Sequence, residues 1–295
     1  MRLFLRVLQS LLLLLPAPIA AQPLLPDTVY AWQRTELRSV DIASWDAMED
    51  ADGDLLRAYD VADVTEAVYV RGTARVRVRV LSLRGRERAF GLFRAMTPDV
   101  GVHGIVGDAF CFAGRETFCA FGPFVVQLTA SGRRAPPPDE ALLLAAKRSL
   151  FRQADCYGTD IPLPAEERIL GSERYLAPAA EAWAQFQNTA FVPLRELCRT
   201  HAAWVAHYEK PLLGVRRTLI SFPFRQSAAA AMFAARLRNR CADRGREFLS
   251  ACASPAYGME GAVFHVALAR DRVILVISDL RDSGCCAWVE SLRNG

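Results

Sequence analysis

Lysine is almost missing from this chain: only Lys147 and Lys210 occur among 295 residues, and arginine supplies the other fixed cations. The formal net charge is +4, which is small for a chain of this length. A nucleic-acid-binding protein needs a concentrated excess of positive charge. The composition therefore does not support nucleic acid as a partner. Arginine in place of lysine, together with abundant alanine, indicates GC-rich bacterial coding.

The chain also lacks the short motifs typical of catalytic and metal sites. No two cysteines have the CxxC spacing of zinc ribbons and thioredoxins, and the four histidines form no HExxH pair. Ser172 is not flanked by the glycines of a GxSxG nucleophile elbow. The sequence therefore nominates no catalytic residue, no metal ligand and no cofactor.

Long apolar runs are absent except at the start of the chain. Arg2 and Arg6 precede a mostly aliphatic segment, Val7 to Leu15, and small residues follow as far as Ala21. This order is typical of a secretory signal peptide at residues 1–21, cleaved after Ala21. An uncleaved anchor is the alternative. No later segment approaches the roughly 20 apolar residues of a transmembrane helix. We therefore expect a periplasmic or secreted protein with no transmembrane segment after signal cleavage.

All eight cysteines lie after the predicted signal, and an even number in an exported chain favours disulfides. Six of them are candidates for particular bonds: Cys111, Cys119, Cys241, Cys252, Cys285 and Cys286. A three-residue loop around Gly114 and Arg115 would place Cys111 and Cys119 opposite each other on neighbouring strands. We expect these two cysteines to be bonded.

The other four candidates leave more than one pairing open. A bond between Cys241 and Cys252 would hold a loop in the second half of the chain, and Cys252 paired elsewhere is the alternative. Cys285 and Cys286 are adjacent. Their two possible arrangements are a strained, redox-active bond with each other and two separate bonds to other cysteines.

The two halves of the chain repeat the same order of sequence features. At one constant spacing, Tyr69 corresponds to Tyr208 and Ala89 to Ala228. Each half contains a β-rich run, a polar turn, a helix with apolar residues at helical spacing (86–96 and 226–240) and closing strands. The sequence therefore predicts an α+β protein of two duplicated modules, each a mainly antiparallel sheet packed with helices.

The predicted domains follow from this repeat. Residues 22–160 form the first module, which ends with a helix at 139–154, and residues 161–295 form a linker and the second module. The boundary lies near Gly158 to Pro164. The second copy is about nine residues longer, and we expect the extra residues between Cys241 and Gly261.

Two short segments resemble a known group of proteins. They are Ala89-Phe90-Gly91 and, between the two halves, Gly171-Ser172-Glu173-Arg174-Tyr175. Both are similar to segments of the exported bacterial proteins of the uncharacterised DUF6599 family, over about Tyr30 to the end of the chain. The family's early Asn-Gly-Gly element has only Glu49 to Asp54 in its place. The resemblance implies export and a two-halved architecture, and it brings no established activity.

Two surfaces are candidates for binding. Glu173, Arg174 and Tyr175 provide a charge pair and an amphipathic ring in the linker 162–175, at the seam between the modules, where concave surfaces tend to form. The alternative is that Glu173 and Arg174 only tie the linker to the modules.

The second surface is a strand in which Arg75, Arg77 and Arg79 alternate with valines. One face of such a strand is basic. It is interpreted either as a solvated face that pairs with nearby carboxylates or as a contact for anionic envelope phosphates.

The sequence thus predicts an exported protein of the bacterial envelope that acts by binding or assembly rather than by catalysis. Its partner is unknown, and an envelope protein or an anionic envelope surface are the candidates. Two alternatives remain open: an extracytoplasmic hydrolase, and a thiol–disulfide protein that uses Cys285 and Cys286.

Overall fold

The structure is a computed structural model of the 295-residue chain. It describes residues 25–40, 53–97, 102–103, 109–131, 140–151, 162–169, 172–178, 192–210, 215–248, 255–259, 262–282 and 284–294. The predicted signal peptide, Gly171 and Cys252 lie outside these residues.

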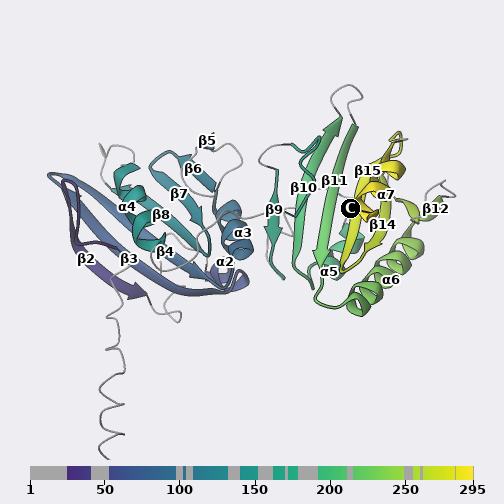
Figure 1. Ribbon diagram of the computed structural model, residues 1–295, viewed down its shortest axis with the longest axis horizontal. Coiled ribbons are helices and arrows are strands. Elements are labelled where there is room, and N and C mark those ends of the chain that lie inside the picture. The colour runs from purple at the N-terminus through teal and green to yellow at the C-terminus, as the bar shows by residue number, and fades with distance from the viewer. Residues whose placement is uncertain are drawn as a thin grey trace, which may run out of the picture.

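The first module is built on an eight-stranded sheet in which all neighbouring strands are antiparallel. Its strand order is β1-β2-β3-β4-β8-β7-β6-β5 (Figure 1). The strands are β1 (Thr28–Val29), β2 (Trp32–Val40), β3 (Val61–Arg71), β4 (Ala74–Leu83), β5 (Val102–His103), β6 (Ala109–Ala113), β7 (Glu116–Phe121) and β8 (Phe124–Ser131).

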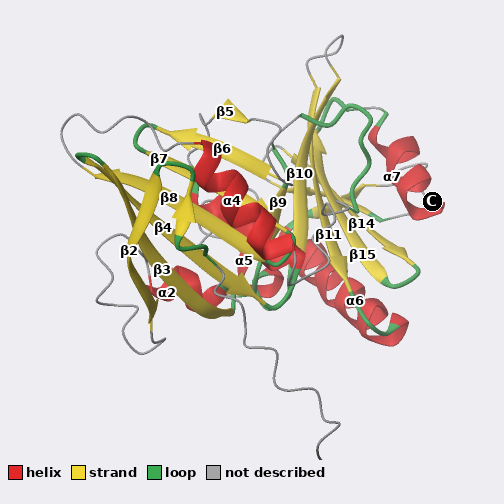
Figure 2. Ribbon diagram, turned by 60° about the vertical axis from the view of Figure 1, so that its left-hand side comes forward, coloured by secondary structure: helices red, strands yellow, loops and turns green. Residues whose placement is uncertain are grey.

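Helices cover both faces of this sheet. Helices α2 (Gly53–Ala58) and α3 (Arg86–Met96) share a core with one face, in which Leu92 of α3 is buried with Leu81 of β4. Helix α4 (Glu140–Phe151) covers the other face, where Leu143 is buried with Val78 (Figure 2). Successive residues of a strand point to opposite faces, so the alternating sequence of β4 supplies both cores.

The second module is a seven-stranded antiparallel sheet in the order β12-β13-β14-β15-β11-β10-β9. Helices α5 (Val192–Cys198) and α6 (Ser227–Arg244) pack on one face, and α7 (Cys285–Asn294) packs on the other. The strands are β9 (Arg174–Leu176), β10 (Ala203–Lys210), β11 (Val215–Pro223), β12 (Arg246–Phe248), β13 (Ala256–Met259), β14 (Ala262–Ala269) and β15 (Arg272–Asp279).

The two sheets share one topology, and the fold is α+β. From β2 onward the first order is β2-β3-β4-β8-β7-β6-β5, and the second, starting from its opposite edge, is β9-β10-β11-β15-β14-β13-β12. Tyr69 and Tyr208 occupy matching positions in β3 and β10, as predicted. Each hydroxyl donates a hydrogen bond to a proline carbonyl, Pro26 at 2.6 Å and Pro164 at 3.0 Å.

The predicted match of Ala89 with Ala228 is wrong by two residues. Ala89 is fully buried in α3, whereas Ala228 is exposed and the first buried alanine of α6 is Ala230. The cause is a hairpin: residues 72–73 connect β3 to β4, but residues 211–214 connect β10 to β11. Part of the extra length of the second copy therefore lies in this connection, and not only in the loop after α6.

The first sheet ends at Ser131 and the second begins at Arg174. The boundary predicted near Gly158 to Pro164 falls between them. Within the part of the chain that the structure describes, no helix is both long and apolar enough to cross a membrane.

The predicted bond between Cys111 and Cys119 is wrong, because the turn is one residue shorter than expected. Ala113 pairs directly with Glu116, so Cys111 lies opposite Phe118, and Cys119 comes one residue later. A shift of one residue reverses the face of the sheet. Cys111 and Cys119 consequently enter different cores, and neither forms a disulfide.

The predictions for Cys241, Cys285 and Cys286 are tested by the state of each cysteine in the structure. Cys241 is a free buried thiol of α6, so the bond predicted to Cys252 is not formed. Cys286 is disulfide-bonded, whereas the adjacent Cys285 is a free buried thiol. A redox-active bond between Cys285 and Cys286 is therefore absent.

Candidate functional site

The seam between the modules is a direct contact between helix α3 and the edge strand β9. A Cβ atom added to Gly91 of α3 would lie 2.4 Å from the backbone oxygen of Tyr175 and 2.5 Å from Cε1 of Tyr59. The Tyr59 hydroxyl donates a hydrogen bond of 3.2 Å to the same Tyr175 oxygen. Glycine at position 91 thus permits an approach that any other side chain would block.

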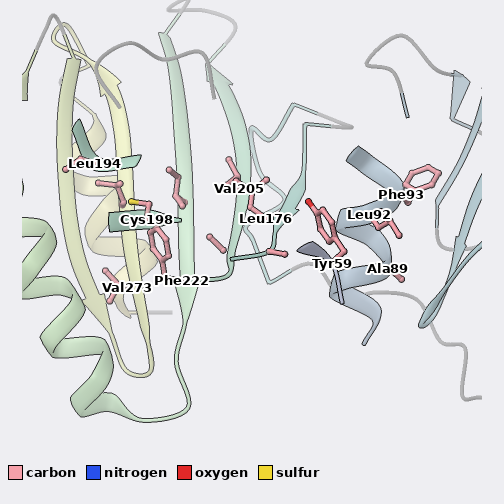
Figure 3. Packing of buried hydrophobic residues seen from close by; sticks show 14 of the residues in the cluster. Tyr59, Ala89, Leu92, Phe93, Leu176, Leu194, Cys198, Val205, Phe222 and Val273 are labelled. Carbon is pink, nitrogen blue, oxygen red and sulfur yellow. The ribbon is translucent and has the colours of Figure 1, made fainter. Parts of the chain in front are cut away.

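Apolar and aromatic side chains continue across this seam. Phe90 of α3 lies against Trp204 of β10, with ring centroids 5.7 Å apart, and Tyr175 meets the same ring edge-on at 5.3 Å. Leu92 and Leu176 belong to one buried core that extends into both modules (Figure 3). The segments around Gly91 and Tyr175 therefore meet in space.

The three residues predicted as a binding site make internal contacts. Glu173 is 5% exposed and forms an ion pair with Arg168 at 2.8 Å. Arg174 donates a hydrogen bond of 3.0 Å to the backbone oxygen of Glu173. Tyr175 is half-buried in the seam, where burial is the main cause that raises the pKa of its hydroxyl. These contacts favour the alternative in which the linker is tied to the modules, and binding by these residues stays a prediction.

A row of polar side chains crosses five strands of the first sheet, and we call it the polar row. Its members are Arg38, Glu66, Arg79, Gln127 and Glu116, in that order from β2 to β7. Arg79 pairs with Glu66 at 2.7 Å, Arg38 donates to Glu66 at 2.8 Å, and Arg79 donates to Gln127 at 3.0 Å. Gln127 in turn donates to Glu116 at 2.9 Å.

The polar row lies on the same face of the sheet as α3, which covers the part of β4 that follows Arg79. The three central residues of the row are buried. Glu66, Arg79 and Gln127 are each 3% exposed. Burial alone would raise the pKa of Glu66, but hydrogen bonds and positive charge from Arg38 and Arg79 outweigh it and lower the pKa. Arg75 of the same strand pairs with Glu36 at 2.8 Å. The basic strand face predicted from the sequence is thus largely matched by carboxylates.

A second buried charge cluster lies under α7 in the second module, and sequence reasoning missed it. Arg217 donates to both carboxylate oxygens of Asp282, at 2.5 and 2.8 Å, and both side chains are 2% exposed. Hydrogen bonding to Asp282 raises the pKa of Arg217. The guanidinium also stacks over Trp288, 5.0 Å from the ring centroid.

A cysteine, a histidine and an aspartate meet at this cluster, which is the composition of some nucleophilic sites. Burial raises the pKa of the Cys285 thiol to about 11, and burial lowers the pKa of His265. Asp282 is already engaged by Arg217. A catalytic thiol needs a lowered pKa and access to substrate, and Cys285 is 1% exposed. The arrangement supports packing, not nucleophilic attack.

His201 and His207 also have structural surroundings. His201 lies between Phe224 and Phe233, with centroid distances of 5.1 and 4.4 Å, and burial lowers its pKa. His207 shares a 3.0 Å hydrogen bond with Thr218. Within the described ranges, no three metal-ligating side chains come together.

Comparisons of this chain with protein families, with curated proteins and with solved structures found no match. The site must therefore be judged from its own geometry.

Proposed function

We propose that this chain is an exported protein of the bacterial envelope that acts by binding a partner and not by catalysis. One observation carries the proposal: each chemically capable cluster that the structure describes is closed. The buried charges of the polar row and of the Arg217 cluster form ion pairs with neighbouring side chains, and burial raises the pKa of Cys285. The signal-like residues 1–21 and the resemblance to the DUF6599 family support export.

The open edge of the first sheet is the surface that we assign to the partner. Strand β2 is nine residues long and mostly exposed, and among the described residues its outer backbone edge is bonded only by Asp27, Thr28 and Val29. Its counterpart β9 has three residues and lies against α3. Unpaired N–H and C=O groups at a sheet edge accept an extended segment of another protein as an added strand.

A protein segment fits this edge better than an anionic envelope surface does. The arginines nearest to it are already paired: Arg75 with Glu36, and Arg38 with Glu66. Phosphate binding would require these pairs to open. Backbone pairing along β2 leaves them in place.

In-cell photo-crosslinking tests this proposal. The full chain with its leader is produced in a bacterium with a photoreactive residue in place of Leu37, which is 44% exposed on β2. The control position is Met232, which is 60% exposed on α6. We expect a shortened chain in the envelope fraction and a protein adduct of defined mass from position 37 alone.

Two results would contradict it. Retention in the cytoplasm with the leader intact would remove the proposed location, and equal adducts from positions 37 and 232 would remove the assigned surface. Hydrolysis of ester, peptide or glycoside substrates by the purified mature chain, lost in Cys285→Ala, would support the hydrolase alternative instead.

A further inference from the structure

Two buried thiols in the second module lie on helices that pack against each other. Cys198 is the last residue of α5, and Cys241 lies on the inner face of α6, four residues after Leu237 and eight after Phe233. Helices α5 and α6 are in contact, and both cysteines are fully buried in the same core. The chain that follows α5 stays at this helix, because the His201 ring lies 4.4 Å from Phe233.

The electrostatics agree with this placement. Burial is the main cause that raises the pKa of Cys198, and the neighbouring Cys241 group raises it further. Cys111 differs. Burial raises the pKa of its thiol too, but the second influence is the positive charge of Arg94, which lowers that pKa. Cys241 thus lies close enough to Cys198 to raise the pKa of its thiol, whereas Cys111 and Cys119 are directed into different cores.

Both thiols are free in this structure, and we infer that Cys198 and Cys241 form a structural disulfide that joins α5 to α6 when the chain folds under oxidising conditions. A bond forms between the two Sγ atoms, and each thiol loses its proton. The two electrons pass to the disulfide of an oxidised dithiol, which leaves as two thiols. The inference depends on the proposed export only for the oxidant that the cell would supply.

Burial sets the order of events. Thiol–disulfide exchange proceeds through the thiolate, and burial raises the pKa of the Cys241 thiol to about 12. The thiolate is therefore scarce in the folded chain. The bond forms during folding, before α5 covers α6, or on local opening of the pair.

Differential alkylation of the purified full chain tests the inference. The chain is refolded from denaturant with a glutathione redox buffer and quenched with acid. Free thiols are alkylated in guanidinium, and bonded ones are reduced and then labelled with a second reagent. We expect Cys198 and Cys241 in the second label, in one linked peptide, and Cys111 and Cys119 in the first. Cys198 and Cys241 recovered in the first label would overturn it.

A stability measurement separates this bond from any other. Reductant should lower the thermal midpoint of the refolded chain by roughly 5–10 °C. Reductant also breaks the bond of Cys286. The Cys198→Ala/Cys241→Ala variant should therefore lose only the part of that sensitivity that comes from its own bond, and the matched Cys111→Ala/Cys119→Ala variant should keep all of it. Equal sensitivity in both variants would contradict the inference. If the bond forms in vitro and is missing from protein recovered from cells, the proposed export fails and the inference stands.

Discussion

The two modules share a topology, yet the same face of each sheet has opposite chemistry. Three residues before Tyr69 and Tyr208, the cross-strand row in the first module is Glu66, Arg79 and Gln127. The matching row in the second is Val205, Ile220 and Leu275. These three apolar residues are at most 1% exposed in the core that α6 covers. The same order of antiparallel strands therefore forms with different inward side chains.

On the opposite faces of the two sheets, the first module is apolar and the second carries the buried charges. Val76 lies directly across from Tyr69, and Arg217 lies directly across from Tyr208. The first module fills that face with aliphatic residues under α4, and the second buries the Arg217–Asp282 pair under α7. In each module, one face of the sheet thus carries an apolar row at this level, and the opposite face carries the buried ion pair. A buried ion pair adds little net stability over apolar packing, but a buried charge that has lost its partner is strongly destabilising.

The largest expected effect comes from breaking the pair in the second module. Asp282→Ala leaves the Arg217 guanidinium buried with only Glu167 nearby, at 3.7 Å. We expect a loss of about 3–5 kcal/mol in the free energy of unfolding. Urea unfolding measures it, with Glu290→Ala as control because its pair with Arg293 is partly exposed. Equal stability of the two variants would show that Arg217 is better solvated than its 2% exposure indicates.

The second effect tests the seam. Gly91→Ala places a methyl group against the backbone oxygen of Tyr175, and neither α3 nor β9 has a flexible side chain end to move aside. We expect a loss of about 3 kcal/mol by overpacking. Met232 occupies the matching position of α6, two residues after Ala230, and is 60% exposed. Met232→Ala should change stability by less than about 0.5 kcal/mol. Similar effects would mean that the modules are not held by this contact.

The third prediction replaces the centre of the polar row in the first module with the matching apolar residues of the second. The triple variant Glu66→Val, Arg79→Ile, Gln127→Leu gives the first module the apolar row of the second. Replacing a whole buried ion pair by packed apolar residues is neutral or stabilising, and we expect a gain of about 1–2 kcal/mol. The single change Glu66→Val should instead destabilise, because Arg79 keeps its charge. A triple variant less stable than this single variant would contradict the comparison.

Local sequence patterns predicted the helices and strands well, but they did not predict contacts between residues that are far apart in the sequence. Apolar spacing predicted the helix at 86–96, which is α3, and the closing strands predicted for the two halves are β8 and β15. Arg217 and Asp282 are far apart in sequence, and neither stands in a motif, so nothing local indicated their pairing. Gly91 did leave a signal, since a glycine inside a helix is unfavourable unless a close contact requires it.

The cysteine predictions failed for a related reason. Pairing of Cys111 with Cys119 depended on the length of one turn, and a single residue reversed the face of the strand. The match of Ala89 to Ala228 failed through a connection two residues longer. Sequence patterns give the type of an element more reliably than its register, because side-chain alternation repeats every two residues.

The fourth prediction compares acid sensitivity. The folded pKa of His265 is depressed, so the stability it contributes is present above its ordinary pKa of 6.5 and is lost as the pH falls towards the folded value. Glu66 is also depressed, from 4.5, and its contribution is lost at lower pH. Urea midpoints should fall in two steps. His265→Thr, which copies Thr117 of the first module, should remove part of the step near pH 6, where His201 and His207 also contribute. Glu66→Gln should reduce only the acid step, and a reversed assignment would contradict both.

The smallest expected effect concerns a hairpin turn in which the two modules have different residues at the position with positive φ. Gly122 connects β7 to β8 with φ of 51°, and Arg270 connects β14 to β15 with φ of 48°. A left-handed conformation costs a residue with a Cβ atom about 1–2 kcal/mol, and glycine avoids that cost. Glycine also gains about 0.4–1 kcal/mol of conformational freedom in the unfolded chain, which offsets part of the benefit. We therefore expect Arg270→Gly to stabilise the protein by about 0.5 kcal/mol, measured as a higher urea midpoint at unchanged slope. Arg270→Ala is the matched control, because it removes the same side chain and keeps the strain. If the alanine variant gains as much as the glycine variant, the effect belongs to the arginine side chain and not to the backbone.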